Sequence, residues 1–89
     1  MKIYKRTEIW YDYTRCDVNL VQSEFSITPY DKSKSPLNGF YQFNEIEIPD
    51  IYSPEDALEI VKLAYKKGKI VDSKVSLADC EMLITIIKK

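Results

Sequence analysis

Glu45 and Glu47 are the two carboxylates whose type and spacing come closest to a chemical site. Two residues apart on a strand, they would project from one face, about 6.5–7 Å from each other. Such a pair could share a cation or divide the roles of general acid and general base. The neighbouring sequence offers neither a third ligand nor the signature of a cleft, and we interpret the pair as a solvated strand face.

A longer run of carboxylates surrounds this pair. Positions 44 to 61 contain no Lys or Arg, and they hold six acidic residues: Glu45, Glu47, Asp50, Glu55, Asp56 and Glu59. Such a surface could imitate nucleic-acid phosphates or dock on the basic surface of a partner protein. The alternative is a solvated strand followed by the first turn of a helix, where the helix dipole favours carboxylates.

Lysines cluster just after the acidic run, at Lys62, Lys66, Lys67, Lys69 and Lys74. They could contact phosphates, with Tyr65 available to stack on a base. However, we expect Tyr65 in the core, and the C-terminal end of a helix favours cations whether or not they bind a ligand. Nucleic-acid binding is therefore our second interpretation of the chain.

Aromatic residues offer another contact surface. We expect Tyr4, Trp10 and Tyr41 on strand faces opposite the apolar ones, where an aromatic group beside charge is typical of a binding hot spot. If both sides of the sheet were covered, the same residues would be core. Leu63 lies about 60° outside the apolar stripe of its helix and could mark an oligomer or partner face.

The chain contains no histidine and only two glycines. Histidine is the usual acid–base group near neutral pH and the commonest metal ligand, and a phosphate-binding loop needs several glycines. Cys16 and Cys80 stand far apart, and we expect both to be reduced and unlinked. We assign no catalytic, cofactor-binding or metal-ligating residue and expect binding rather than catalysis.

Three strands must position the residues of the first half. Alternation with period two predicts strands over 2–13, 18–28 and 40–48. A shift of phase between Val18 and Val21 indicates a β-bulge. The polar segment 31–39 is predicted to be a loop that ends in an Asn-Gly turn. We expect the strands to form an antiparallel meander, with Phe40, Ile46 and Ile48 on the apolar face of the third.

A helix is predicted over 54–67. Ser53 is its N-cap, Asp56 completes a capping box, and Gly68 is the C-cap. The segment 77–88 is ambiguous, because Ser76 and Asp79 form a second capping box whereas the β-branched run that follows is typical of a central strand. We favour a helix and keep a fourth strand as the alternative.

With 89 residues and a net charge of −1, the chain has room for one α+β domain, residues 1–89, and is not a strongly basic nucleic-acid binder. It has no apolar run of membrane-spanning length, and its N-terminal residues lack the apolar core of a signal peptide. We expect a cytoplasmic protein without a cofactor.

In overall style the chain resembles small accessory proteins of phages and mobile elements, some anti-CRISPR inhibitors among them, because it is short, rich in Tyr and Lys, and carries an acidic stretch without a catalytic set. The resemblance implies a non-catalytic protein-binding module that inhibits a bacterial defence or nucleic-acid-handling protein. We expect a partner protein with a basic surface, bound through the acidic run together with Tyr4 and Trp10.

Overall fold

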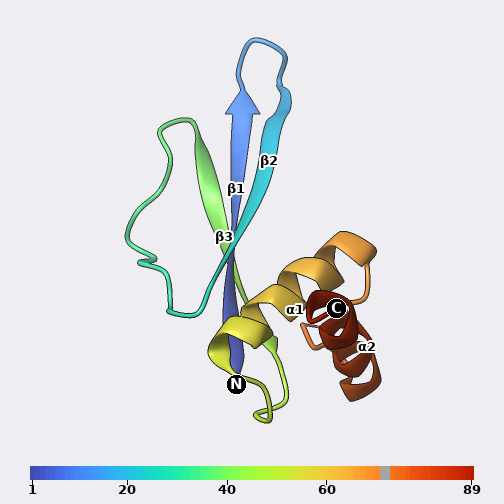
Figure 1. Ribbon diagram of the computed structural model, residues 1–89. Helices are drawn as coiled ribbons and strands as arrows, with labels where there is room; N and C mark the ends of the chain where they lie inside the picture. The colour runs from blue at the N-terminus through green and yellow to red at the C-terminus, as the bar shows by residue number, and fades with distance from the viewer. Residues whose placement is uncertain (71–72) are drawn as a thin grey trace.

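The structure is a computed structural model that describes residues 1–70 and 73–89, apart from the side chains of residues 19 and 20. It has an α+β fold, as predicted, with an antiparallel sheet and two helices packed near one end of that sheet (Figure 1). The elements are β1 (Lys2–Asp12), β2 (Asp17–Ser26), β3 (Gly39–Glu47), α1 (Pro54–Lys67) and α2 (Leu77–Ile87).

The strand order is β2-β1-β3, and both outer strands run antiparallel to β1. The predicted meander is therefore wrong in one respect, since β3 pairs with β1 and not with β2. Periodicity identifies the faces of a strand but not its neighbours. Here residues 27–38 carry the chain along the sheet and across β1, which a tight turn could not do.

The predicted bulge is confirmed in β2. Trp10 pairs with Leu20 whereas the next residue, Tyr11, pairs with Val18, so that β2 holds one extra residue at this point. On the other side of β1 the chain enters β3 at Gly39. A Cβ atom at this position would lie 2.0 Å from the carbonyl oxygen of Ile9, and only glycine permits so close an approach.

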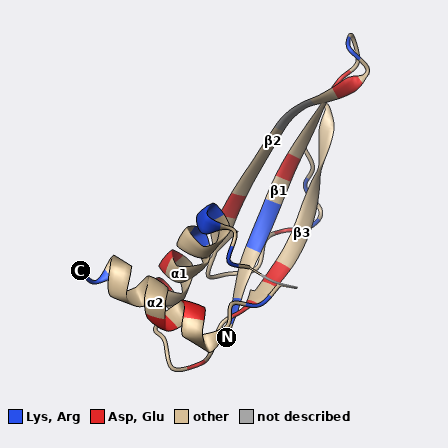
Figure 2. Ribbon diagram, turned by 90° about the vertical axis from the view of Figure 1, so that its right-hand side faces the viewer, with Lys and Arg blue, Asp and Glu red and all other residues tan. Residues whose placement is uncertain are grey.

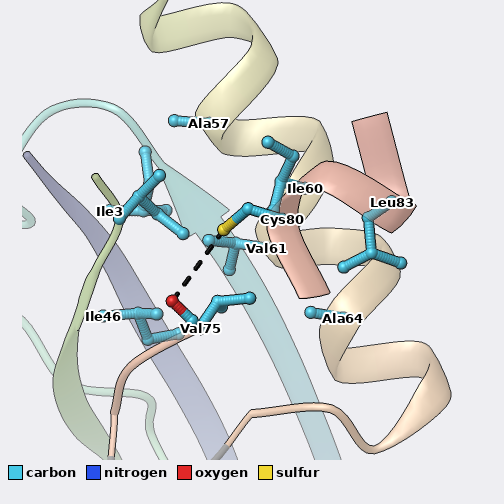
Figure 3. Close-up of a cluster of buried hydrophobic side chains, with 10 residues drawn as sticks. Ile3, Ile46, Ala57, Ile60, Val61, Ala64, Val75, Cys80 and Leu83 are labelled. Atoms are coloured by element: carbon cyan, nitrogen blue, oxygen red, sulfur yellow. Dashed lines mark hydrogen bonds between the residues drawn. The ribbon is translucent and has the colours of Figure 1, made fainter. Parts of the chain in front are cut away.

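The hydrophobic core lies between the helices and the end of the sheet that carries Ile3 and Ile46 (Figure 3). This is the lower end of the sheet in Figure 1. The sheet supplies side chains from its helix-facing side, both helices supply one apolar face each, and the segment before α2 closes the layer. Its fully or almost fully buried members are Ile3, Ile46, Ile48, Ala57, Ile60, Val61, Ala64, Val75, Cys80 and Leu83.

The capping signals of α1 are confirmed. The hydroxyl oxygen of Ser53 accepts a hydrogen bond from the backbone N–H of Asp56 at 3.2 Å, and Gly68 ends the helix in the left-handed conformation with φ of 69°. The segment that was ambiguous in the sequence forms the helix α2, and the alternative of a fourth strand over 77–88 is wrong. Ser76 caps α2 by accepting from the N–H of Asp79 at 3.1 Å, and burial of Cys80 and Leu83 outweighs the β propensity of the following residues.

Two predictions about α1 are wrong. Tyr65, which we expected in the core, is 47% exposed and lies beside the sheet, with its ring centroid 4.2 Å from Nζ of Lys5. Leu63, which we expected outside the apolar stripe, is partly buried against the core. The reason is that α1 has two apolar neighbours, since it packs on α2 as well as on the sheet, and this rotates the buried stripe away from Tyr65.

The sheet continues well beyond the helices (Figure 1), which gives the molecule principal extents of 46 × 25 × 22 Å. Phe40 was predicted to face the apolar side of the sheet. It does so, but it is 56% exposed because α1 covers only the lower rows of that side. Within the described residues, neither helix has the length and apolar character needed to cross a membrane.

Candidate functional site

The side of the sheet away from the helices carries a group of aromatic residues. Successive strand residues point to opposite faces, and the register therefore places even-numbered residues of β1 beside odd-numbered residues of β3 on this side. Tyr30 joins them from the loop 27–38. We call this surface the aromatic face and define it by Tyr4, Arg6, Trp10, Tyr30, Tyr41 and Phe43.

Arg6 lies at the centre of the aromatic face. Its guanidinium carbon is 4.9 Å from the ring centroid of Tyr30 and 4.6 Å from that of Tyr41, within the range of cation–π attraction. Its Nη2 atom forms a salt bridge of 2.6 Å with Glu24 on β2. The contacts of Arg6 thus join all three strands to the loop.

Phe43 extends the aromatic contacts towards a cleft. Its ring centroid is 6.0 Å from that of Tyr41 and 6.4 Å from that of Tyr30. Between the loop and the sheet lies an open cleft of about 400 Å³. Its lining combines aromatic rings with charged and amide groups and consists of Tyr4, Lys5, Pro29, Tyr30, Lys32, Phe43, Asn44 and Glu45.

Charged side chains of lysine and glutamate lie at or beside the cleft. Nζ of Lys32 lies 5.9 Å from the ring centroid of Phe43, and Nζ of Lys2 lies 3.0 Å from a carboxylate oxygen of Glu45. The hydrogen bond to Glu45 raises the pKa of Lys2 above its ordinary value. Partial burial raises the pKa of the Tyr30 hydroxyl, and the negative charge of Glu24 adds to this effect. The Tyr30 hydroxyl is therefore neutral at physiological pH.

Trp10 lies at the other end of the aromatic face, where its indole N–H donates a hydrogen bond of 2.6 Å to Glu8. Tyr4, Trp10 and Tyr41 thus share one side of the sheet and are all half-buried, which is intermediate between the two states that the sequence left open. Sequence reasoning missed Arg6, Tyr30 and Phe43. Period two could have found Arg6 and Phe43 once Tyr4 and Tyr41 were placed, whereas no local signal brings Tyr30 to the sheet.

The acidic run does not form one continuous surface. Glu45 and Glu47 lie on β3, on the side away from the helices, while the carboxylates of Glu55 and Glu59 belong to α1 (Figure 2). Cations of the chain itself also pair with four of the six acidic groups. These pairs are Glu45 with Lys2 (3.0 Å), Asp50 with the amino group of Met1, Asp56 with Lys88 (3.1 Å) and Glu59 with Lys62 (3.9 Å).

The pair Glu45 and Glu47 is placed as a solvated strand face, as interpreted. Both residues are exposed, and Lys2 and Lys74 line the same shallow hollow. Across the described ranges 1–70 and 73–89, no cluster of three or more Cys, Asp or Glu side chains is arranged to hold a metal ion.

Most of the lysine cluster lies on the other side of the sheet from the aromatic face, whereas its member Lys74 lines the hollow beside Glu45 and Glu47. Figure 2 shows its α1 members at the C-terminal end of that helix, which packs on the side that carries Ile3 and Phe25. Tyr65 is the aromatic ring beside these lysines, and its ring centroid lies 5.4 Å from that of Phe25. Hydrogen bonds from Ser23 and Lys5 lower the pKa of Tyr65.

Both cysteines are free thiols, as predicted. Cys16 is exposed in the turn between β1 and β2, with a positive φ of 53°. Cys80 is fully buried, and its thiol lies 3.8 Å from the carbonyl oxygen of Val75 (Figure 3). Burial in the core raises the pKa of the Cys80 thiol.

Comparison of the chain with protein-family models, with curated proteins and with solved structures gave no match.

Proposed function

We propose that the chain is a non-catalytic protein-binding module whose cleft accepts a basic side chain of a partner protein. One observation carries this proposal, namely the cleft between the loop 27–38 and the sheet, where Tyr4, Tyr30 and Phe43 meet the carboxylate of Glu45. Aromatic ring faces attract cations, and a nearby carboxylate adds a charge-assisted hydrogen bond. An arginine or lysine side chain suits this combination.

The chain's own cations already use these rings in the same way. Arg6 lies between Tyr30 and Tyr41, and Lys32 lies above Phe43. Lys32 is exposed on the loop and can turn away when another cation arrives, whereas Arg6 is held by Glu24. A partner side chain would therefore replace Lys32 above Phe43 and compete with Lys2 for Glu45.

In this proposal the acidic residues on α1 act on a basic partner only through long-range electrostatic attraction. Steering by such charges raises the rate of encounter with a basic partner, more than it raises affinity. An inhibitor of a nucleic-acid-handling or defence protein, of the kind that phages and mobile elements encode, fits the proposal, since basic surfaces are what such proteins present to nucleic acid.

The first experiment is an NMR titration of the labelled protein with the capped pentapeptide Gly-Gly-Arg-Gly-Gly, with the glutamine peptide of the same length as control. We expect the arginine peptide alone to shift the amide signals of Tyr4, Phe43 and Glu45 at millimolar concentration, since one cation–π contact is worth about 0.5–2 kcal/mol. Glu45→Gln should weaken the response and Glu47→Gln should not, because Glu47 lies outside the cleft. Equal shifts with both peptides would contradict the proposal.

Nucleic-acid binding is the second candidate, favoured by the lysines of α1 with Tyr65 beside them. The aromatic face and these lysines lie on opposite sides of the sheet, so that one strand of nucleic acid could not use both. Mobility shift of a single-stranded thymidine oligonucleotide, at low salt and again at physiological salt, tests this candidate. Retardation that survives physiological salt and is lost in Lys66→Glu would favour it over the protein-binding proposal.

A further inference from the structure

The part of the sheet beyond the helices presents a second surface, on the side opposite the aromatic face. We call it the arm face, and it consists of Ile9, Tyr11, Tyr13, Val18, Val21 and Phe40. Tyr13 is 70% exposed, Val21 is 61% exposed and Phe40 is 56% exposed. Every one of these side chains is uncharged, and apolar groups that gather in this way mark an interaction surface.

Helix α2 presents a matching surface. Its inner side buries Cys80 and Leu83, and its outer side carries the α2 stripe, Ala78, Met82 and Ile86, at helical spacing of four residues. Met82 is 42% exposed and Ile86 is 46% exposed. The stripe is thus apolar on the side that faces away from α1.

These two surfaces fit each other in kind. A sheet buries its apolar face under helices, which is what α1 does for the lower rows of the same side. From Ala78 to Ile86 a helix rises about 12 Å. On β1 the arm face runs from Ile9 to Tyr11, a rise of about 7 Å, and Tyr13 extends it into the turn after the strand. The chain's own α2 packs against α1 near the lower end of the sheet and does not reach the arm face (Figure 1).

The exposed area of the arm face and the α2 stripe is sufficient for a weak but specific dimer. A large side chain offers about 150–200 Å², so the two surfaces together expose roughly 600 Å² on each copy. A contact that buries both surfaces on both copies would remove about 1,200 Å² from water, which is the lower limit for stable interfaces.

We propose that two copies of this chain form a two-fold dimer in which the α2 stripe of each copy covers the arm face of the other. The contact is made twice, because each copy supplies one helix and one sheet surface. This dimer contact leaves the aromatic face free on both copies. The dimer can therefore be tested independently of the function proposed above.

Sedimentation of the chain of residues 1–89 over a concentration series tests the dimer. We expect a mass of twice 10.4 kDa at about 100 µM and dissociation in the micromolar range. Phe40→Glu and Met82→Glu should each weaken association more than about tenfold, because a charge would enter the apolar contact. Leu37→Glu is the matched control, since Leu37 is 92% exposed outside both surfaces and should leave the mass unchanged. A mass of one chain at every concentration would overturn the proposal.

Cross-linking distinguishes this arrangement from other dimers. Two preparations are mixed, both with Cys16→Ser, one with Phe40→Cys and the other with Met82→Cys. A short bismaleimide should link position 40 of one copy to position 82 of the other. Links between two copies at position 40, without links from 40 to 82, would show that arm faces meet each other and would overturn the helix-on-sheet contact.

Discussion

The guanidinium carbon of Arg6 lies 4.9 Å from the ring centroid of Tyr30, and this contact fastens the crossing loop to the central strand. Residues 27–38 contain no helix or strand of their own, and their position depends on such side-chain contacts together with a backbone hydrogen bond from Tyr11 to Asn38. The cleft has the loop as one wall. The geometry of the candidate site therefore depends in part on a cation–π contact between residues 24 positions apart in the chain.

Tyr30→Ala should release the loop from the sheet. We expect hydrogen exchange to rise at residues 27–38, because the mutation removes the ring that holds them, while exchange at Ile60 stays unchanged. The free energy of unfolding should fall by about 1–2 kcal/mol, from the cation–π contact and the buried part of the ring. Tyr30→Phe keeps the ring and should behave as wild type. Faster exchange in Tyr30→Phe as well would show that the hydroxyl, and not the ring, holds the loop.

Substitutions in α1 test the core and its caps. Val61→Asp should unfold the protein, since Val61 is fully buried and an unpaired charge there costs roughly 3 kcal/mol or more. Ser53→Ala and Ser76→Ala should each cost only about 1 kcal/mol, because each removes one capping hydrogen bond. Thermal denaturation followed by circular dichroism measures all three. A cooperative transition of Val61→Asp at the wild-type temperature would place residue 61 outside the core.

Local signals in the sequence predicted the helices well. The N-cap residues Ser53 and Ser76 act within four residues, and the structure contains both N-cap hydrogen bonds. Tyr65 and Leu63 were misplaced because their burial depends on where α2 packs, which the sequence of α1 does not contain. The strand order was missed for a similar reason, since pairing of β3 with β1 depends on the path of a loop and not on the pattern of either strand.

The candidate site was predicted only in part. Tyr4 and Glu45 lie at the cleft and are cross-strand partners, and this pairing depends on the register between β1 and β3. The acidic run seemed continuous because the sequence is linear, whereas the fold puts its two halves on different elements and supplies cations from distant positions. Lys88, which pairs with Asp56, comes from the far end of the chain.

The two cysteines should differ in reactivity. Cys16 is exposed and should react with iodoacetamide within minutes, whereas Cys80 should react only after denaturation, because the fold buries its thiol. Mass spectrometry before and after addition of denaturant counts the modified thiols. Modification of both in the native protein would show that α2 opens readily, and an oxidised pair would contradict the free state of both thiols.

Burial of Cys80 also gives the stability a dependence on pH. The folded-state pKa is raised above the unfolded value, so the folded protein keeps this proton where the unfolded chain loses it. The stability contribution is complete below the unfolded pKa, about 8.5–9, and is lost as pH rises through the folded pKa. We expect urea midpoints to fall above pH 9 and expect Cys80→Ala to reduce this slope. An unchanged slope would assign the alkaline loss to other groups, such as Lys2.

Charge reversal in two separate sets tests which carboxylates bind a basic partner. The structure divides the acidic run, and we expect Glu45→Lys with Glu47→Lys to abolish the response to the arginine pentapeptide, because this pair includes the carboxylate at the cleft. Glu55→Lys with Glu59→Lys should leave the response intact, since those residues belong to α1. All four positions are exposed, and both variants should keep the wild-type circular dichroism spectrum.

The salt dependence of peptide binding distinguishes binding in the cleft from attraction to a diffuse acidic surface. Attraction between exposed charges is screened beyond about 8–10 Å at physiological ionic strength, whereas a cation stacked on Tyr4 or Phe43 is screened much less. We therefore expect the pentapeptide affinity to fall only a few-fold between low and physiological salt. If both double variants lose the response equally and salt abolishes it in wild type, the peptide is attracted by net charge alone and the cleft is not its site.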